Sequence, residues 1–393
     1  MAEHIRPHIC LVYGTRPEAI KLAPIYLELQ NRGAHFRTTV VVTAQHRELL
    51  DQMLSVFGIQ PDVDLDIMQA GQTLSGVTCR ALSSLQETLH SLAPDMVLVQ
   101  GDTTTVFAGA LAAFYEKIAV GHVEAGLRTG NRYSPFPEEI NRKLTGVLTN
   151  LHFAPTERAR DALVAENVDP ASVFITGNTV IDALYLIRQR IGRGDDEAAP
   201  VPEGGGERTL LVTIHRRENQ GVIFTRICRA LEQIAGKFED LRIIWPLHPN
   251  PVVRKTAHEL LGDVPGIELT EPLDYLAFVR LMDSADLILT DSGGVQEEAV
   301  ALDVPVLVAR DTTERPEGLK AGATRLVGTE TEEIVRNVSE LLTSPGAYAK
   351  MSQAPCPYGD GKASVRICDA LEHHFALREH PPKDYIWQHV EGA

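Results

Sequence analysis

Three carboxylates lie in a short stretch of the sequence, GHVEAGLRTGNRYSPFPEEINR (121–142), that has little helical or strand periodicity. Glu124, Glu138 and Glu139 follow the apolar run IAVGHV, which is typical of the end of a buried strand. Carboxylates that share a cleft push one another's pKa values apart, so that one can act as an acid and another as a base. We therefore predict that this segment lies at a cleft and performs acid–base chemistry.

Two further side chains extend this acid–base group. Asp102 lies in QGDTTT and His215 in IHRREN, and each motif directly follows an apolar run. Each residue also has a structural interpretation, because Asp102 could cap the helix that follows it and His215 could bind backbone groups at a strand end. We expect His215 to face the carboxylates from a second domain.

Glycines after a strand predict a phosphate site. In LILTDSGGVQEEA, Ser292, Gly293 and Gly294 stand between a strand and a helix start, whose free N–H groups can bind phosphate. An ordinary helix cap is the alternative for this motif. Glu298 lies one turn into the same helix and could accept hydrogen bonds from ribose hydroxyls.

Two arginines are candidates to bind phosphates with their planar fork of donors. Arg16 lies in GTRPEAIK and Arg315 in DTTERPEG. The alternatives are a salt bridge with Glu18 for the first and a solvated surface position for the second.

The motifs GxGxxG and GxxxxGK[ST] are missing, which argues against a nicotinamide cofactor and against a P-loop enzyme. His122 and Glu124 have HxE spacing without a third ligand, so we predict no metal and no cofactor.

Composition narrows the class of protein. With 393 residues, 44% hydrophobic and 23% charged, the chain is typical of a globular protein with two domains. Its formal net charge of −16 argues against a nucleic-acid partner. The five cysteines are scattered and never in CxxC spacing, and the first apolar run is too short for a secretory signal. We predict a cytoplasmic protein without a membrane segment.

Apolar runs alternate with helix-like stretches, which predicts an α/β fold with parallel sheets. The pattern stops in the Gly, Pro and acidic segment 192–208 and then resumes. We expect two Rossmann-like domains, and because ligands bind beyond the carboxyl ends of parallel strands, an active-site cleft between them. The predicted boundaries are 1–191 joined by a C-terminal helix at 363–380, the linker 192–208, the domain 209–362 and the tail 381–393.

The motifs also carry a family resemblance. They are, in chain order, GTRPEAIK, QHRE, QGDTTT, HVEAGLRTG, PFPEEINR, HFAPTERAR, ITGNTVIDAL, HRREN, HPNP and TDSGGVQEEA. Across nearly the whole chain they resemble the non-hydrolysing UDP-N-acetylglucosamine 2-epimerases. The resemblance implies a GT-B-like homodimer that converts UDP-N-acetylglucosamine reversibly to UDP-N-acetylmannosamine. The implied chemistry is elimination of UDP to a bound 2-acetamidoglucal, followed by re-addition of UDP.

The resemblance also implies residue roles. It implies catalytic roles for Asp102, Glu124, Glu138 and His215. It implies UDP binding by Arg16, Ser292, Gly293, Gly294, Glu298 and Arg315. For activation by a second molecule of substrate, it implies Gln45, Arg80, Arg216 and His248. Some activated relatives carry a second glutamine where this chain has Glu48, and an anionic side chain there opposes strong activation.

Other functions remain open from the sequence. A hydrolysing epimerase would release UDP and free N-acetylmannosamine, and a related epimerase would act on a UDP-diacetamido sugar. A GT-B glycosyltransferase would use the same UDP site with an acceptor. A sensor that binds a UDP-sugar without turnover would have little reason to keep Asp102, Glu124, Glu138 and His215 together.

Overall fold

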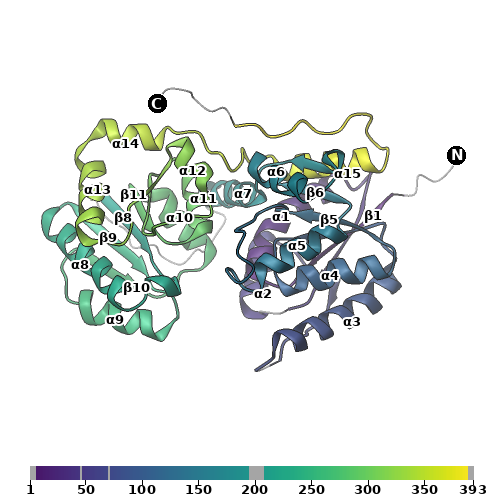
Figure 1. Ribbon diagram of the computed structural model, residues 1–393, viewed down its shortest axis with the longest axis horizontal. Helices are drawn as coiled ribbons and strands as arrows, with labels where there is room; N and C mark the ends of the chain where they lie inside the picture. The colour runs from purple at the N-terminus through teal and green to yellow at the C-terminus, as the bar shows by residue number, and fades with distance from the viewer. Residues whose placement is uncertain (1–5, 45–46, 70, 194–207, 388–393) are drawn as a thin grey trace. The chain divides into compact units, whose positions relative to one another are not determined.

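The computed structural model describes residues 6–44, 47–69, 71–193 and 208–387 (Figure 1). These residues divide into two compact units. The first runs to Ala183 and takes up Gly359–Ile386, and the second contains Leu184–Tyr358. The helix α7 (Thr179–Arg193) therefore carries the chain from one unit to the other, and residues 194–207 of the predicted linker lie outside the described residues.

The first unit is built on one parallel sheet. In its described part the sheet has seven strands in the order β3-β2-β1-β4-β5-β6-β7. The strands are β1 (His8–Tyr13), β2 (Arg37–Val42), β3 (Val63–Asp64), β4 (Met96–Gln100), β5 (Ala119–Val123), β6 (Leu151–Ala154) and β7 (Val173–Ile175). Every residue of the central strands β1 and β4 is buried, because helices cover both faces of a parallel sheet.

Helices connect these strands and begin where the sequence offers start signals. Pro17 lies in the first turn of α1, and the side chain of Thr103 caps α4 by accepting from Val106 N at 3.3 Å. The helices of the unit are α1 (Arg16–Asn31), α2 (Arg47–Phe57), α3 (Leu74–Leu92), α4 (Thr104–Tyr115), α5 (Glu138–Leu148), α6 (Glu157–Ala165) and α15 (Ala363–His374). A short 3-10 helix, η1 (Pro170–Ser172), precedes β7.

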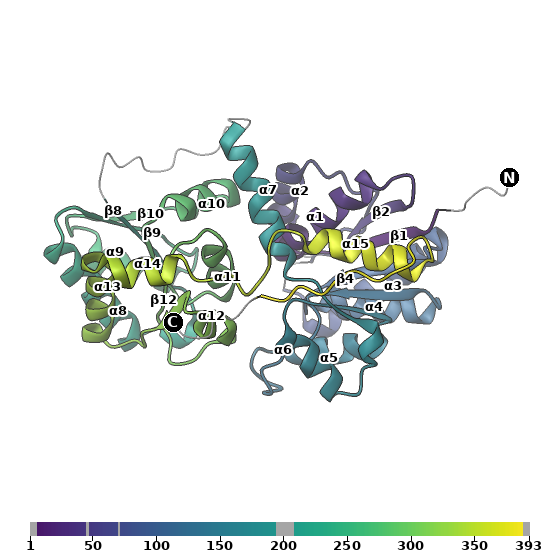
Figure 2. The same cartoon turned by 90° about the horizontal axis from the view of Figure 1, so that it is seen from above.

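The C-terminal helix α15 belongs to the first unit and lies beside α1 (Figure 2). Arg32 at the end of α1 reaches Asp369 at 2.7 Å. The helix that the sequence predicts over 363–380 ends earlier, at His374. Ala376 has a φ of 56°, and this left-handed turn brings later N–H groups back onto the carbonyl of Glu372.

The tail after α15 binds the edge of the first sheet. Tyr385 N donates to Ile175 O at 2.7 Å, and Ile175 N donates to the Asp384 carboxylate at 2.9 Å. These contacts satisfy backbone groups that edge strand β7 would otherwise leave open. Residues 388–393 of the predicted tail lie outside the described part of the chain.

The second unit repeats the plan with a smaller parallel sheet. Within the described residues it has six strands in the order β10-β9-β8-β11-β12-β13. The strands are β8 (Arg208–Thr213), β9 (Leu241–Pro246), β10 (Ile267–Thr270), β11 (Leu287–Thr290), β12 (Val306–Val308) and β13 (Thr324–Leu326). Its helices are η2 (Arg217–Asn219), α8 (Val222–Lys237), α9 (Pro251–Leu261), α10 (Tyr275–Ser284), α11 (Gly293–Ala301), α12 (Pro316–Ala321), α13 (Thr331–Thr343) and α14 (Pro345–Ser352).

The predicted fold class is confirmed, since both units are α/β with parallel strands. In each sheet the strand order changes direction at one point, between β1 and β4 in the first unit and between β8 and β11 in the second. The loops at the carboxyl ends of strands beside such a point form the usual ligand site of this architecture. The predicted cleft between the domains stays a prediction. In the part of the chain described here, no helix combines the length and apolar character needed to cross a membrane.

Candidate active site

Glu124 directly follows β5 and is 8% exposed. Its φ of 61° lies in the left-handed region, which a non-glycine residue adopts at a cost and often at functional sites. Lys21 Nζ lies 2.6 Å from both carboxylate oxygens, and the amide of Asn178 donates to Oε1 at 3.1 Å. The amide of Gln100 also donates to Oε2. A cation and two amides surround Glu124, and an ionised carboxylate satisfies all of these donors.

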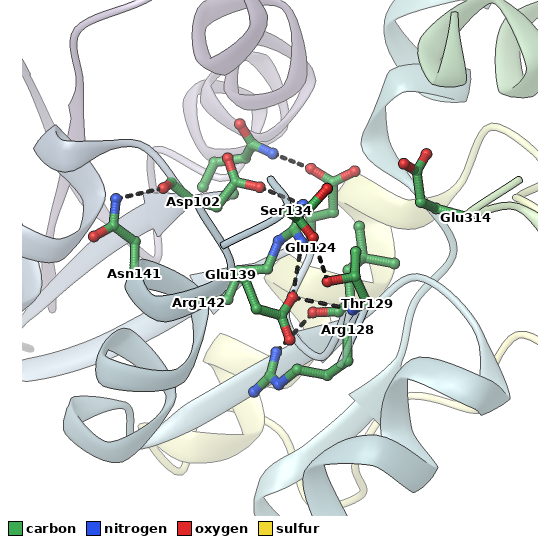
Figure 3. Close-up of polar contacts among 12 residues, drawn as sticks. Asp102, Glu124, Arg128, Thr129, Ser134, Glu139, Asn141, Arg142 and Glu314 are labelled. Carbon is green, nitrogen blue, oxygen red and sulfur yellow. Dashed lines mark hydrogen bonds and ion pairs between the residues drawn. The ribbon is translucent and has the colours of Figure 1, made fainter. Parts of the chain in front are cut away.

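Asp102 is held by the first turns of helix α5 (Figure 3). Arg142 Nη2 lies 2.6 Å from Asp102 Oδ2, and the Asn141 amide donates to the backbone carbonyl of Asp102 at 2.9 Å. Arg142 also contacts Glu139 at 3.3 Å. The arginine therefore joins the loop after β4 to the start of α5, and Asp102 faces a cation rather than capping α4, which Thr103 does.

Glu138 and Glu139 have different surroundings although they are neighbours in the sequence. Glu139 is 1% exposed and accepts the N–H groups of Thr129 and Gly130 at 3.0 and 3.2 Å (Figure 3). Glu138 is the first residue of α5, and within the described residues its buried Oε2 has no hydrogen-bond partner. Successive helical residues point about 100° apart, which explains the difference. Glu139 therefore fixes the turn, whereas Oε2 of Glu138 has no partner among the described residues.

The loop after β1 is tied to the loop after β4 by Glu18. Its carboxylate accepts from Gly14 N at 3.1 Å and from Thr103 Oγ1 at 2.8 Å. Complete burial raises the pKa of Glu18 to about 7. The side chain of Arg16 is exposed at the first residue of α1. Glu18 thus turns into the protein to join two loops, and Arg16 lies at the surface where it can meet an anion.

Two buried histidines lie on neighbouring strands beneath these loops. His122 and His152 pair in the register of β5 and β6. The imidazole of His122 contacts Gly101 O at 2.7 Å. Burial lowers the pKa of His122 to about 3 and the pKa of His152 to about 4, so both rings are neutral at pH 7. His122 therefore supports the Gly101 turn.

In the second unit, the loop after β8 is organised by Asp291, which follows β11 and is fully buried. Asp291 Oδ2 accepts the backbone N–H groups of His215 at 3.0 Å and Arg216 at 2.8 Å. The Asn219 amide donates to the same oxygen at 3.0 Å and to Ala309 O at 3.2 Å. This one carboxylate thus fixes the loop that carries two predicted site residues.

His215, Arg216 and His248 lie together in this unit. The imidazole rings of His215 and His248 stack with centroids 5.2 Å apart and planes 10° from parallel. Arg216 Nη1 lies 3.4 Å from Glu314 Oε1. The loops after β8 and β9 therefore bring one predicted catalytic residue beside two of the predicted activator residues.

The start of α11 is suited to an anion. Ser292 precedes the helix without a side-chain cap, and its N–H donates to Thr290 Oγ1 at 2.9 Å. A Cβ added to Gly293 would lie 3.9 Å from the guanidinium groups of both Arg216 and Arg315. Two cations thus flank the first glycine of the helix, where free N–H groups and the helix dipole also favour negative charge. Gly294, the next residue, is exposed.

Glu298 and Arg315 are both anchored near this helix start. Glu298 is 7% exposed and accepts from the Tyr275 hydroxyl at 2.7 Å. The guanidinium of Arg315 pairs with Glu297, which neighbours Glu298 on α11. These contacts hold the Glu298 carboxylate and the Arg315 guanidinium in place near the start of α11.

The remaining predicted residues are placed as follows. Arg80 lies on α3 in the first unit. Its guanidinium donates to the Gln72 side chain at 2.6 Å and to Ile67 O at 3.3 Å. Gln45 lies outside the described residues. The sequence reasoning did not assign roles to Lys21, Gln100, Asn178, Arg142 or Asp291. All five stand inside motifs that the resemblance uses, namely GTRPEAIK, QGDTTT, ITGNTVIDAL, PFPEEINR and TDSGG, and that position was the available signal.

Two parallel-sheet Rossmann-like units, with polar residues gathered at the carboxyl ends of their strands, define an α/β enzyme of the GT-B-like class. Comparison with known proteins gives the family. Residues 28–372 match the family model described as UDP-N-acetylglucosamine 2-epimerase. The chain belongs to the UDP-N-acetylglucosamine 2-epimerase family, and the predicted enzyme class, an isomerase, is confirmed.

Individual relatives agree with this membership. The UDP-N-acetylglucosamine 2-epimerase of Bacillus subtilis is 52% identical over 378 residues, which cover 96% of this chain and 98% of that protein. The Escherichia coli K12 enzyme of the same name is 53% identical over 371 residues, covering 93% and 98%. The crystal structure of UDP-GlcNAc 2-epimerase from Neisseria meningitidis bound to UDP-GlcNAc matches with a TM-score of 0.85, 48% identity, and coverage of 93% and 99%.

Proposed function

We propose that this chain interconverts UDP-N-acetylglucosamine and UDP-N-acetylmannosamine without hydrolysis. The observation that carries the proposal is the set of carboxyl groups after β4 and β5 and at the start of α5. Asp102 and Glu124 each face a cation, and Glu138 has an oxygen without a partner in the described residues. Such a set can take a proton from one face of a sugar and return it to the other.

The proposed reaction is an elimination followed by an addition. A base removes the hydrogen on carbon 2 as a proton, the bond between carbon 1 and the UDP oxygen breaks, and its electron pair leaves with UDP. A double bond remains between carbons 1 and 2 of the glucal. Re-addition of UDP to carbon 1 accompanies protonation of carbon 2 on the opposite face. Because no carbonyl adjoins that hydrogen, stabilising the leaving UDP must assist the step.

The surroundings of the carboxyl groups suggest which part each group takes in the proton transfer. Asp102 and Glu124 pair with Arg142 and Lys21, and we assign these two carboxylates as proton acceptors. Glu138 Oε2 has no partner among the described residues, and Glu138 is our candidate for the group that exchanges a proton with the sugar. His215 assists from the loop after β8.

We assign the UDP moiety to the start of α11. Ser292, Gly293 and Gly294 would bind the diphosphate through free N–H groups, with Arg315 and Arg16 as its cations. Glu298 would accept from the ribose hydroxyls. We propose that the two groups of residues serve one substrate molecule, so a substitution in either unit should abolish the same reaction.

A homodimer is the proposed assembly. The last turns of α4 and α5, two helices in contact, expose Phe114, Tyr115, Leu144 and Val147 by 57%, 55%, 42% and 85%. Large exposed apolar side chains on neighbouring helices are candidates for a protein interface. These residues support an interface with a second copy of this chain.

Activation by a second UDP-N-acetylglucosamine is the proposed regulation. Arg80, Arg216 and His248 are the cationic or hydrogen-bonding groups for the activator, and Gln45 completes the set. Glu48 should weaken activation relative to a chain with glutamine there. We also propose a cytoplasmic enzyme that supplies nucleotide sugars for cell-surface polysaccharide biosynthesis.

Product analysis tests the proposal. Purified protein is incubated with UDP-N-acetylglucosamine alone, and the mixture is followed by proton and phosphorus NMR. We expect UDP-N-acetylmannosamine at equilibrium with the starting sugar and no lasting free UDP. Accumulation of UDP with free N-acetylmannosamine would indicate a hydrolysing enzyme instead. The Glu138→Gln variant should bind UDP without turnover, and Glu87→Gln, an exposed glutamate on α3, is the matched control.

A further inference from the structure

Asp291 lies between strand β11 and helix α11, and its carboxylate accepts several hydrogen bonds. It is fully buried, and an unpaired carboxylate in such a place would be costly. Among the described residues, the donors to its carboxylate come from the segment after β8, namely the N–H groups of His215 and Arg216 and the amide of Asn219. The charge of Asp291 is therefore directed at the loop that carries His215.

The imidazole of His215 also faces Asp291. Its Nδ1 lies 3.4 Å from Asp291 Oδ1, while the Asp291 contact with Arg216 N uses Oδ2. The side chain of His215 is 36% exposed, so one edge of its ring is open. Stacking on His248 limits rotation of the ring. The carboxylate thus meets one ring nitrogen, and the other is left for a ligand.

We propose that Asp291 is the positioning residue for His215. It fixes the backbone of His215 through the N–H group and keeps the ring proton on Nδ1, so that Nε2 presents a lone pair to the substrate. A carboxylate beside one nitrogen of an imidazole selects the tautomer in this way. This inference rests on the proposed function, in which His215 takes part in the reaction.

Asn219 separates this proposal from a purely structural role of Asp291. Asn219 is 2% exposed and holds the same oxygen of Asp291 together with Ala309 O, but no described contact joins it to the ring of His215. Asn219→Ala therefore weakens the anchoring of the loop and leaves the ring contact in place. Asp291→Asn keeps the shape of the side chain and changes the partner of Nδ1.

The first test is nitrogen-15 NMR of the protein labelled at histidine, with the His215 signals identified by their loss in His215→Asn. We expect the wild type at pH 8 to carry the proton on Nδ1, Asn219→Ala to keep it there, and Asp291→Asn to move it to Nε2. A wild-type His215 protonated on Nε2 would overturn the proposal. The wild-type spectrum decides this point even if Asp291→Asn does not fold.

The second test is a double-mutant cycle on kcat for UDP-N-acetylglucosamine. We expect Asp291→Asn to lower kcat by roughly 100-fold or more in the wild type, and by less than about threefold in His215→Asn, because residues acting as a unit are not additive. Equal losses in both backgrounds would contradict a role through His215. If the wild type does not convert the sugar nucleotide, the proposed function fails, whereas the His215 tautomer still decides the role of Asp291.

Discussion

The guanidinium of Arg142 lies 2.6 Å from the carboxylate of Asp102, and this ion pair joins the loop after β4 to helix α5. Both side chains are mostly buried, at 13% and 25% exposed. A charge pair with so little solvent around it is screened less than a surface pair. Arg142 is therefore well placed to set the position of Asp102.

Arg142→Gln should lower kcat/KM by about 100-fold, because a shift of Asp102 by about 1 Å suffices for such a loss. Steady-state kinetics with UDP-N-acetylglucosamine checks this. Lys143→Gln is the matched control, since Lys143 is the next residue of α5, is 46% exposed and pairs with Glu166. If the Arg142→Gln enzyme were as active as Lys143→Gln, Arg142 would not be needed to position Asp102.

Lys21→Met should destabilise the first unit, because it leaves the buried carboxylate of Glu124 without its cation. Removing one member of a buried pair costs about 3 kcal/mol or more in the free energy of unfolding. Adding Glu124→Gln should recover part of that loss, although turnover stays absent. Urea unfolding of both single variants and the double variant measures the coupling. Additive losses would show that the two side chains do not interact.

The buried histidines predict acid sensitivity. Burial lowers the pKa of His152 from 6.5 to about 4, so the unfolded chain takes up a proton before the folded protein does. As the pH falls from about 6.5 to 4, this difference in proton uptake lowers the free energy of unfolding by about 1.4 kcal/mol per pH unit. His122, with a pKa lowered to about 3, acts with the same sign.

Urea unfolding at pH 7 and pH 5 tests this expectation. Between pH 7 and pH 5, the free energy of unfolding of His152→Gln should fall by about 2 kcal/mol less than that of the wild type. His90→Gln, whose side chain is 78% exposed, serves as the control and should follow the wild type. Equal losses in His152→Gln and the wild type would show that His152 does not titrate in the expected way.

Val147→Glu should weaken the proposed homodimer, because it places a charge at an apolar residue that is 85% exposed. Light scattering during size-exclusion chromatography should give a dimer mass for the wild type and a monomer mass for the variant. Val222→Glu on α8, at a residue 70% exposed, is the control and should stay dimeric. A wild type that is monomeric at high concentration would contradict the assembly.

The sequence predicts the central strands and the glycine turns well because these signals are local. Apolar runs such as HICLVY and MVLVQ are buried at every residue, and a pattern of that kind depends only on the chain itself. The first residues of α5 were harder to predict. Glu138 and Glu139 lie in a segment with little periodicity, and their helix begins after two prolines.

The partners of the site residues could not be predicted in the same way. Lys21 meets Glu124 across 103 residues of sequence, and Asp291 meets His215 across 76. Such pairs form only when parallel strands bring their carboxyl ends to one edge, so composition and spacing say nothing of them. The end of α15 was missed for a different reason, because it depends on a left-handed turn at Ala376 that no glycine marks.

Solvent exchange at carbon 2 of the sugar is the most direct test of proton transfer by the carboxyl groups. Purified protein is incubated with UDP-N-acetylglucosamine in deuterated water, and proton NMR follows the carbon 2 hydrogen in both sugar nucleotides. We expect UDP-N-acetylmannosamine with deuterium at carbon 2, and gradual labelling of the remaining UDP-N-acetylglucosamine. Formation of UDP-N-acetylmannosamine that keeps its original hydrogen at carbon 2 would contradict proton transfer by these carboxyl groups.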